Sequence, residues 1–391
     1  MKRFLITALA VLLFMLPSCS WNLEDDVTDK VTQDISNIPS DGAFLNEIER
    51  GIDYSPSSYR VQASDFDIGD GVFHYKVGRL HILYNPKTNY AHYMCFIPGC
   101  THKFQTCLGN WLRASSNFIY CDGDLYCLYL HPILEQDTES GLARISPDGS
   151  TMEMLYRMDP SGTYGMYAAP GYIYINKRNE GLMRYDISTG KMEIIGEFLS
   201  GLIVTEHGLI VHSSKSKKLL LTDLDMKNPK ELMIDRTKVL YSDNRLYYCK
   251  LEKDETGNPL SIEFYEYNLA TDTDRSIGRV AGSSWDLLCV AEGYLYYLPN
   301  SPEAKSRITI YRVDIETGEV KTAMEDSKVQ LQEMYYVNGK YYAYCKINAS
   351  LAPWISPGRL YGSSIGGELV DRNNDGLFEF EPFVFDATDF P

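Results

Sequence analysis

Residues 287–298 read LLCVAEGYLYYL, and residues 307–324 read RITIYRVDIETGEVKTAM. Apolar and polar residues alternate through each run, which is the periodicity of a half-buried β-strand. Glu292-Gly293 interrupts the first run and Glu316-Thr317-Gly318 interrupts the second, and both have the composition of hairpin turns. The stretch therefore predicts four consecutive antiparallel strands joined by short connections.

The same four-strand unit recurs along the chain. Its second strand follows a short turn at Asp70-Gly71, Asp122-Gly123, Pro170-Gly171, His207-Gly208, Asp243-Asn244, Glu292-Gly293 and Asn338-Gly339. Its third strand and the following turn recur as LARISPDGSTMEML, LMRYDISTGKMEII and FYEYNLATDTDRSI. Successive copies are spaced by roughly 36 to 52 residues, which suits one four-stranded propeller blade.

Residues 58–391 are therefore predicted to form an all-β fold, a single β-propeller of four-stranded blades. Seven copies of the unit indicate seven blades, and the count allows six to eight. A blade cannot bury both of its faces alone, so neighbouring blades have to stack to make a core. Two alternatives stay open: a pair of β-sandwiches, which would need a linker that the composition does not show, and a β-solenoid, which would have a shorter repeat.

Residues 1–18 are typical of a lipoprotein signal peptide. Lys2 and Arg3 form a charged start, and residues 4–16 form an apolar run shorter than the roughly 20 residues of a permanent membrane span. The run ends in Leu16-Pro17-Ser18-Cys19, the pattern of a bacterial lipobox, so Cys19 is expected to carry acyl chains such as palmitate. Pro17 departs from that pattern, and an ordinary secretory peptide cleaved near Ser18 is the alternative.

Charge and composition limit the partners. Residues 19–57 are polar and acidic, which predicts a flexible tether between the anchor and the propeller. A formal net charge of −16 and a pI near 4.9 argue against nucleic acid and anionic membrane surfaces as partners. We expect a monomer in the bacterial cell envelope, attached by lipid to the outer face of the cytoplasmic membrane or to the outer membrane or cell surface.

Reactive side chains are densest in residues 94–107, which read MCFIPGCTHKFQTC. Cys95, Cys100, His102 and Cys107 make up the ligand set of a structural zinc site. Because their spacing is not that of a familiar zinc finger, a disulfide between two of the cysteines and simple packing stay open as alternatives. A catalytic Cys–His pair is chemically conceivable, but no third group that would orient it stands nearby.

These features together resemble a group of bacterial propeller lipoproteins that are common in gut anaerobes. The group carries a lipobox, an acidic tether, Tyr-rich blades and a C-x4-C-x-H-x4-C segment after the first blade, matched here by Cys19, Cys95, Cys100, His102 and Cys107. The resemblance covers nearly the whole mature chain. It implies the fold and the location, and it implies no particular reaction. Residues 96–99 are more apolar than is usual there, which would make the pocket more apolar.

A second metal candidate lies in residues 371–376, which read DRNNDG. The side-chain oxygens of Asp371, Asn373 and Asp375, followed by a glycine, resemble the opening of a calcium loop. The distal Glu of an EF-hand would fall at Pro382, so Glu379 or Glu381 would have to replace it. The alternative is a solvated turn, which is the commonest role of these residues.

Trp111 and Trp285 precede predicted innermost strands, where they could stack against a sugar or peptide ring near the channel mouth. The alternative for both is aromatic packing between blades. Five further cysteines lie singly on predicted strands and are interpreted as small buried hydrophobic residues: Cys121, Cys127, Cys249, Cys289 and Cys345.

Three classes of function fit this sequence. We expect a non-enzymatic binding or scaffold protein that holds a protein or glycan ligand on one propeller face. An exported propeller enzyme acting on glycans or peptides is one alternative, although the sequence shows no phosphate-binding glycine loop, HExxH or GxSxG. An envelope assembly factor that binds partner strands along an exposed blade edge is the other.

Overall fold

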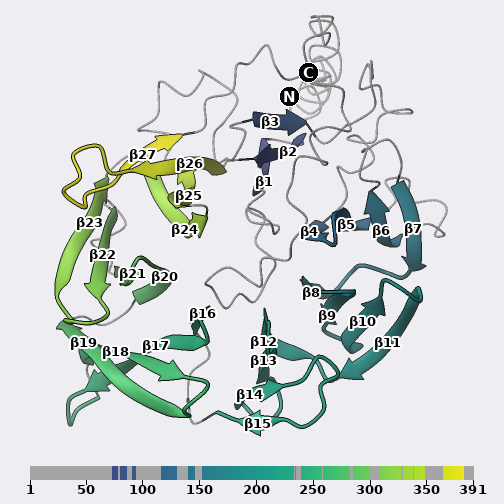
Figure 1. Cartoon of the computed structure of the whole chain (residues 1–391), viewed down its shortest axis with the longest axis horizontal. Coiled ribbons are helices and arrows are strands. Elements are labelled where there is room, and N and C mark those ends of the chain that lie inside the picture. Colours follow the sequence, from purple (N-terminus) through teal and green to yellow (C-terminus); the bar gives the residue numbers. More distant parts are fainter. Residues whose placement is uncertain are drawn as a thin grey trace, which may run out of the picture.

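The computed structural model describes residues 73–77, 80–85, 90–93, 116–129, 140–145, 152–232, 234, 239–257, 259–281, 285–299, 308–326, 329–337, 339–347 and 364–382. These residues contain strands β1 to β27 and no helix (Figure 1). The strands form seven antiparallel sheets, of which the first has three strands and the other six have four. The predicted all-β propeller of four-stranded blades is confirmed, whereas the number of blades stays a prediction.

Each sheet is a meander of consecutive strands. Sheet 1 contains β1 (Phe73–Val77), β2 (Leu80–Asn85) and β3 (Tyr90–Tyr93). Sheet 2 contains β4 (Ser116–Cys121), β5 (Asp124–Tyr129), β6 (Gly141–Ile145) and β7 (Met152–Arg157). Sheet 3 contains β8 (Thr163–Ala169), β9 (Tyr172–Lys177), β10 (Gly181–Asp186) and β11 (Lys191–Gly196). Sheet 4 contains β12 (Leu199–Thr205), β13 (Gly208–Ser213), β14 (Leu219–Thr222) and β15 (Lys230–Glu231).

The remaining three sheets follow the same order. Sheet 5 contains β16 (Leu240–Ser242), β17 (Arg245–Lys253), β18 (Pro259–Asn268) and β19 (Thr273–Ala281). Sheet 6 contains β20 (Trp285–Ala291), β21 (Tyr294–Pro299), β22 (Ile308–Asp314) and β23 (Val320–Asp326). Sheet 7 contains β24 (Val329–Val337), β25 (Lys340–Ile347), β26 (Ser364–Val370) and β27 (Glu379–Pro382).

The first strand of each four-stranded sheet lies toward the centre of the ring and the fourth lies outside (Figure 1). First strands of successive sheets contact one another, as β4 does with β8 and β20 with β24. The first and last sheets are also neighbours, because β1 lies against β26. The sequence offers two segments that could add a closing strand to the ring, 59–63 and 377–385, and the first lies outside the described residues. Within the second, β27 pairs with β26 and so completes sheet 7.

The predicted two-residue turns before the second strands adopt the conformation that hairpins favour. Glu292 and Gly293 both have positive φ, 50° and 80°, as do Asp243 and Asn244, at 48° and 63°. Positive φ at both central residues matches the twist of the flanking strands. Gly supplies this conformation without steric cost, which explains the glycine that recurs in the repeat.

Tyrosine is abundant because it fills the space between neighbouring sheets. The third residue of the second strand is a tyrosine in five of the sheets, and each of these side chains is at most 4% exposed: Tyr126, Tyr174, Tyr247, Tyr296 and Tyr342. Second strands are covered on both faces, so bulky rings suit them. Burial of such a side chain contributes about 1.5–3 kcal/mol.

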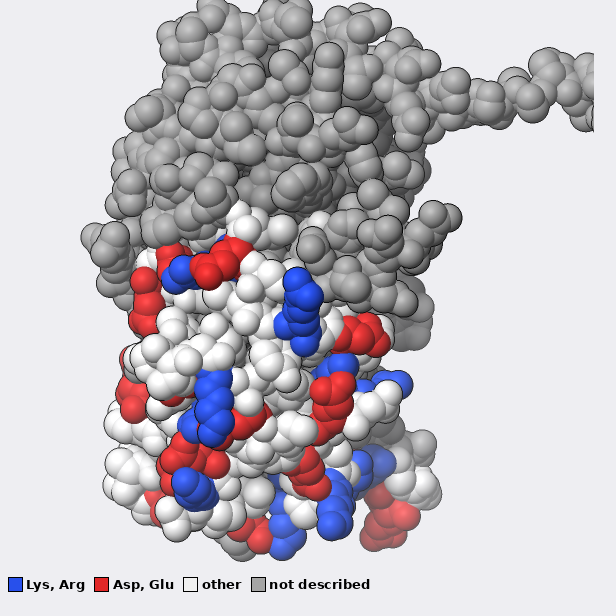
Figure 2. All heavy atoms as spheres, turned by 90° about the vertical axis from the view of Figure 1, so that its right-hand side faces the viewer, with Lys and Arg blue, Asp and Glu red and all other residues white. Residues whose placement is uncertain are grey.

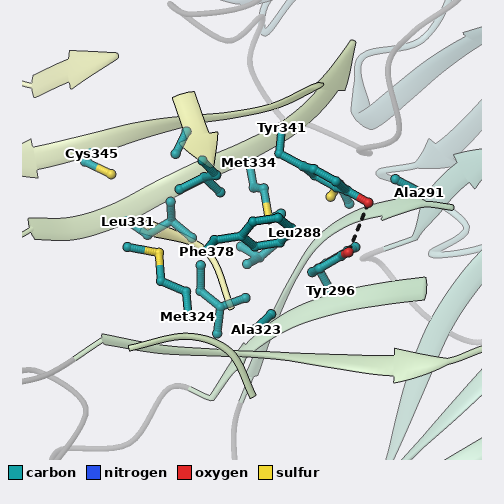
Figure 3. Close-up of a cluster of buried hydrophobic side chains, with 14 residues drawn as sticks. Leu288, Ala291, Tyr296, Ala323, Met324, Leu331, Met334, Tyr341, Cys345 and Phe378 are labelled. Carbon is teal, nitrogen blue, oxygen red and sulfur yellow. Dashed lines mark hydrogen bonds between the residues drawn. The ribbon is translucent and has the colours of Figure 1, made fainter. Parts of the chain in front are cut away.

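The core between sheets 6 and 7 shows this packing (Figure 3). Tyr296 of β21 and Tyr341 of β25 point toward each other from different sheets, and their hydroxyl oxygens lie 3.0 Å apart. Phe378 packs against both rings, with centroid distances of 6.1 Å to Tyr296 and 4.8 Å to Tyr341. The backbone N–H of Phe378 donates to the carbonyl of Ala323 at 2.6 Å, which ties the segment before β27 to sheet 6.

Acidic side chains at two of the turns also join neighbouring sheets. Glu206 accepts a hydrogen bond from the hydroxyl of Tyr241 in sheet 5 at 2.7 Å. Glu292 accepts hydrogen bonds from Tyr336 at 2.8 Å and Tyr341 at 3.0 Å, both in sheet 7. Hydrogen bonds to a charged acceptor are stronger than neutral ones, so these turns connect the sheets as well as reverse the chain.

Candidate functional site

One end of sheets 3 to 5 differs from the rest of the ring. We call it the link face: the ends of β9, β13 and β17, the loops that follow them, and the links 158–162 and 197–198 between sheets. Four of the eight buried polar residues in the described chain lie there, at the last two positions of β9 and β13: Asn176, Lys177, His212 and Ser213, which are 0%, 5%, 3% and 4% exposed.

Two other sheets have leucine at the position of Asn176 and His212, the fifth residue of the second strand. Leu128 of sheet 2 stands where sheet 3 has Asn176 and is fully buried. Leu298 occupies this position in sheet 6. Burying a polar side chain costs free energy unless it is hydrogen-bonded. The propeller fold alone therefore does not explain why polar residues are buried at these positions. The link face is therefore specialised in sheets 3 and 4.

Asn176 joins sheet 3 to sheet 4. Its side-chain amide donates to the carbonyl of Leu199 at 2.8 Å, and its side-chain oxygen accepts from the N–H of Leu199 at 3.1 Å. Both polar atoms of the side chain are thereby satisfied, which makes the burial tolerable. This pair of bonds fixes the start of β12, and with it the position of Ser200.

Two further pairs place carboxylates at the link face. Lys177 forms an ion pair with Glu180 in the loop after β9, and the Lys177 side chain is only 7% exposed. The hydroxyl of Ser213 donates to Glu197 in the link between sheets 3 and 4. Glu180 and Glu197 are themselves exposed to solvent. A buried set of groups thus holds an exposed pair of acids in defined places.

Ser200 and His212 form a hydroxyl–imidazole pair on this face. The register of β12 against β13 shifts between Leu199 and Gly201, so Ser200 is a bulge residue. Its hydroxyl is hydrogen-bonded to Nδ1 of His212. Bulges often redirect side chains next to functional sites. Burial lowers the pKa of His212 below its ordinary value, so the imidazole is neutral at neutral pH.

A neutral imidazole bonded to a hydroxyl can accept its proton, which is the first requirement of a serine nucleophile. The other groups of such a site are not part of this cluster: within the described chain, no hydrogen bond joins a carboxylate to the imidazole of His212. The hydroxyl of Ser200 also lies 3.1 Å from the carbonyl of His212, a partner that keeps it in the sheet. The geometry therefore favours a structural polar cluster.

Most of the site residues predicted from sequence lie outside the described residues. These are Cys19, Cys95, Cys100, His102, Cys107 and Trp111. Their roles in lipidation, zinc or disulfide formation and ligand stacking stay predictions. Trp285 is the first residue of β20, whose partner at that position is Pro299. The backbone of Trp285 thus lies at the inner strand expected from sequence, and its ligand role stays a prediction.

The calcium candidate forms a tight turn between β26 and β27. The two carboxylate oxygens of Asp371 accept backbone N–H groups of Asp375 at 3.1 Å and of Gly376 at 2.8 Å. Asp375 in turn accepts the N–H of Leu377 at 2.9 Å. Nowhere in the described ranges do three or more His, Cys, Asp or Glu residues gather closely enough to hold a metal ion. Calcium binding by Asp371, Asn373 and Asp375 stays a prediction.

The scattered cysteines behave as predicted. Each of the five is buried and forms no disulfide: Cys121, Cys127, Cys249, Cys289 and Cys345. Burial raises the pKa of the Cys289 thiol far above its ordinary value. A protonated, buried thiol is unreactive. We therefore assign these cysteines to the core.

Among the described residues on the side of the molecule that Figure 2 shows, charges of both signs are mixed, and neither Lys and Arg nor Asp and Glu form a broad patch. Many charged side chains of the described residues form ion pairs, as Arg184 does with Glu193 at 2.6 Å. Within the described ranges, no helix has the length and apolar character needed to span a membrane.

No protein-family model matches the chain, and no curated protein matches it. Solved structures similar to it include an oligogalacturonate lyase in complex with manganese, 12% identical with a TM-score of 0.35, covering 57% of this chain and 71% of that one. An oligogalacturonate lyase from Vibrio parahaemolyticus is 10% identical with a TM-score of 0.42, over 74% and 87% of the two chains. The computationally designed Ika8 protein is 8% identical with a TM-score of 0.40, over 75% and 94%. At sequence identities this low, the similarity bears on the fold alone.

Proposed function

We propose that the chain is a lipid-anchored binding protein of the bacterial cell envelope, which acts without catalysing a reaction and holds its ligand at the link face. The lipobox ending at Cys19 supports the anchor. The propeller supplies a rigid ring, and in such folds function resides in loops and strand ends at one face. Contacts among the described residues support a ligand site at the link face.

One observation supports this site above all: buried polar residues gather at the link face of sheets 3 and 4, and sheets 2 and 6 have leucine at the position of Asn176 and His212. Asn176, Lys177 and Ser213 each make bonds that hold a neighbouring segment still. A surface that is ordered before the ligand arrives loses less entropy on binding. This arrangement suits recognition, because its groups are occupied in positioning and not free for chemistry.

The binding site can be tested with the full chain in detergent against a panel of neutral glycans, anionic glycans, peptidoglycan fragments and peptides. We expect at least one class to bind in a concentration-dependent way. Replacing the link-face ion pair, Lys177→Met with Glu180→Gln, is expected to weaken that binding about tenfold, since the buried ammonium of Lys177 no longer holds the exposed carboxylate of Glu180 in place.

The matched control lies at the opposite end of sheet 7, where Lys340 and Glu368 form an exposed ion pair at 3.1 Å. Lys340→Met with Glu368→Gln removes the same two charges and is expected to leave binding unchanged. Absence of binding across the panel, or equal losses in the two double variants, would contradict the proposed site.

Lipid attachment at Cys19 can be tested by substitution. Cys19→Ala removes the thiol that would carry the acyl chains, each of whose buried methylenes contributes about 0.8 kcal/mol to membrane attachment. We expect the variant to move from the membrane fraction to the soluble fraction of the envelope. Ser18→Ala, which keeps the thiol, serves as the control. Unchanged fractionation of Cys19→Ala would show that the chain is not held by lipid at this residue.

A further inference from the structure

Five exposed Lys and Arg side chains in the described chain form no ion pair: Arg157, Arg178, Lys215, Lys217 and Lys253. Apart from Arg312, which stacks on the ring of Tyr294 at 4.6 Å, every other described Lys or Arg side chain pairs with a carboxylate. In a chain with a net charge of −16, cations that remain unpaired stand out.

All five lie at the same end of the ring. Second and fourth strands of a meander run in the same direction, so they finish at the same face. Arg157 and Lys253 are the last residues of β7 and β17, and Arg178 follows β9 directly. Lys215 and Lys217 lie in the loop after β13. The unpaired cations therefore belong to the link face and its continuation on sheet 2.

Cations at the opposite end are neutralised. Lys191 begins β11 and pairs with Glu193 at 3.5 Å. Lys340 begins β25 and pairs with Glu368 at 3.1 Å. The same holds at that end for Lys230 with Asp272 and for Lys321 with Glu319. The described cations are thus paired with carboxylates at the opposite end, whereas several at the link face are unpaired.

The loops that carry these cations are closed by hydrogen bonds. In the loop after β13, the N–H of Lys217 donates to Ser213 and the N–H of Ser213 donates to Lys218, both at 3.0 Å. Lys217 has a φ of 60°, in the left-handed region that lysine seldom adopts. Backbone strain of this kind often accompanies a functional site. These bonds fix the backbone at Lys217 in a strained conformation, and its ammonium group extends into solvent.

From this arrangement we infer that the link face binds an anionic polysaccharide, a chain of sugars that bear carboxylate or sulfate groups. The inference rests on the proposed function and names the ligand class. Arg178 and Lys215 lie in the loops after the second strands of sheets 3 and 4, and Lys253 ends the second strand of sheet 5, so the three cations suit an extended ligand with repeated negative charges. Hydroxyls beside them, such as that of Ser216, suit sugar hydroxyl groups.

An anionic membrane or nucleic acid fits this face less well. Glu180 and Glu197 are exposed among the cations, and a continuous anionic surface would press against them. A polysaccharide can place its charged and neutral groups alternately. Charges beyond about 8 Å are largely screened at physiological ionic strength, so the net charge of −16 does not prevent contacts of this kind.

Three dextrans with one backbone provide the probe: neutral dextran, carboxymethyl-dextran and dextran sulfate. The full chain in detergent is expected to bind one or both charged polymers and not the neutral one, and to lose that binding as salt is raised. The variant with Arg178→Gln, Lys215→Gln, Lys217→Gln and Lys253→Gln is expected to bind about 10- to 100-fold more weakly, given the usual contribution of exposed charge pairs.

The control removes the same four charges from the opposite end: Lys191→Gln, Lys230→Gln, Lys321→Gln and Lys340→Gln. It should bind the charged dextrans as well as the native chain does. Lys217→Gly alone relieves the left-handed backbone, so it should weaken binding while the melting temperature stays the same or rises.

The outcomes separate this inference from the proposed function. Binding of a neutral glycan or a peptide at the link face, with no retention on charged dextran, would overturn the ligand class and leave the binding function intact. Equal losses in the two quadruple variants would show a general charge effect and also overturn it. Binding to vesicles of phosphatidylglycerol that is stronger than binding to either charged dextran would assign the cations to lipid instead.

Discussion

Raising the pH above about 10 is expected to unfold the protein over a narrow range, because tyrosines in the core ionise only in the unfolded chain. Burial raises the pKa of Tyr126 and Tyr174 far above the ordinary value near 10, and that of Tyr296 to about 12. Burial also raises the pKa of five further tyrosines: Tyr185, Tyr241, Tyr247, Tyr297 and Tyr341.

The sign follows from proton binding. Below pH 10 both states keep these hydroxyls protonated, so the tyrosines cause no change in stability with pH. Above it the unfolded chain releases protons that the folded chain retains, and the free energy of unfolding falls. Each tyrosine that ionises only when unfolded removes about 1.4 kcal/mol per pH unit. Three of them suffice to remove about 4 kcal/mol per unit, against a typical total of about 5–15 kcal/mol.

The measurement is a pH titration that follows tyrosinate absorbance and circular dichroism of the sheets in the same sample. The tyrosinate of these buried residues should appear together with the loss of sheet signal. In concentrated guanidinium chloride the same groups should titrate near pH 10. A native sheet signal that persists after nearly all tyrosines have ionised would contradict the assignment of these hydroxyls to a closed core.

Sequence predicted the strands and turns because both depend on local patterns. The alternation of apolar and polar residues predicted β21 and β22. Glu292-Gly293 predicted a hairpin turn, and both residues have the positive φ of such a turn in the structure. The second role of Glu292 could not be predicted, because its partners Tyr336 and Tyr341 lie more than forty residues away. Contacts between sheets depend on how blades pack, and no local pattern encodes that.

The link face was missed for a similar reason. Sequence showed Asn176 and His212 only as polar residues near the ends of second strands, next to the short loops NKRNEG and HSSKSKK. Their significance appears when β9 and β13 are compared with β5, which has Leu128 at the equivalent position. An alignment of the repeats by strand position would have found this signal, since the departure from the apolar pattern is itself visible in the sequence.

The zinc and lipid sites predicted from sequence are not described by the structure. Cys19, Cys95, Cys100, His102 and Cys107 were identified by residue type and spacing, and they lie outside the described residues. Chemistry-bearing motifs can be recognised without structure because the ligand set determines the chemistry. Whether the four Cys and His side chains meet is a tertiary property, which spacing alone does not determine.

Tyr296→Ala is expected to cause a large loss of stability, about 4 kcal/mol, in the range measured when large aromatic core residues are truncated. The side chain is 1% exposed and packs between sheets 6 and 7 against Tyr341 and Phe378 (Figure 3). Truncation leaves a cavity at that junction and removes the hydrogen bond between the hydroxyls of Tyr296 and Tyr341. Because the contact joins two sheets, denaturant unfolding of the whole ring should shift.

Two controls separate the cavity from the hydrogen bond and from tyrosine content. Tyr296→Phe keeps the ring and loses only the hydroxyl, so its cost should be about 1 kcal/mol. Tyr156→Ala makes the same truncation at an outer strand, where the side chain is 36% exposed, and should cost less than about 1.5 kcal/mol. Urea titrations of the three variants measure the difference. Equal shifts for Tyr296→Ala and Tyr156→Ala would mean that the ring is not held together by the core between sheets 6 and 7.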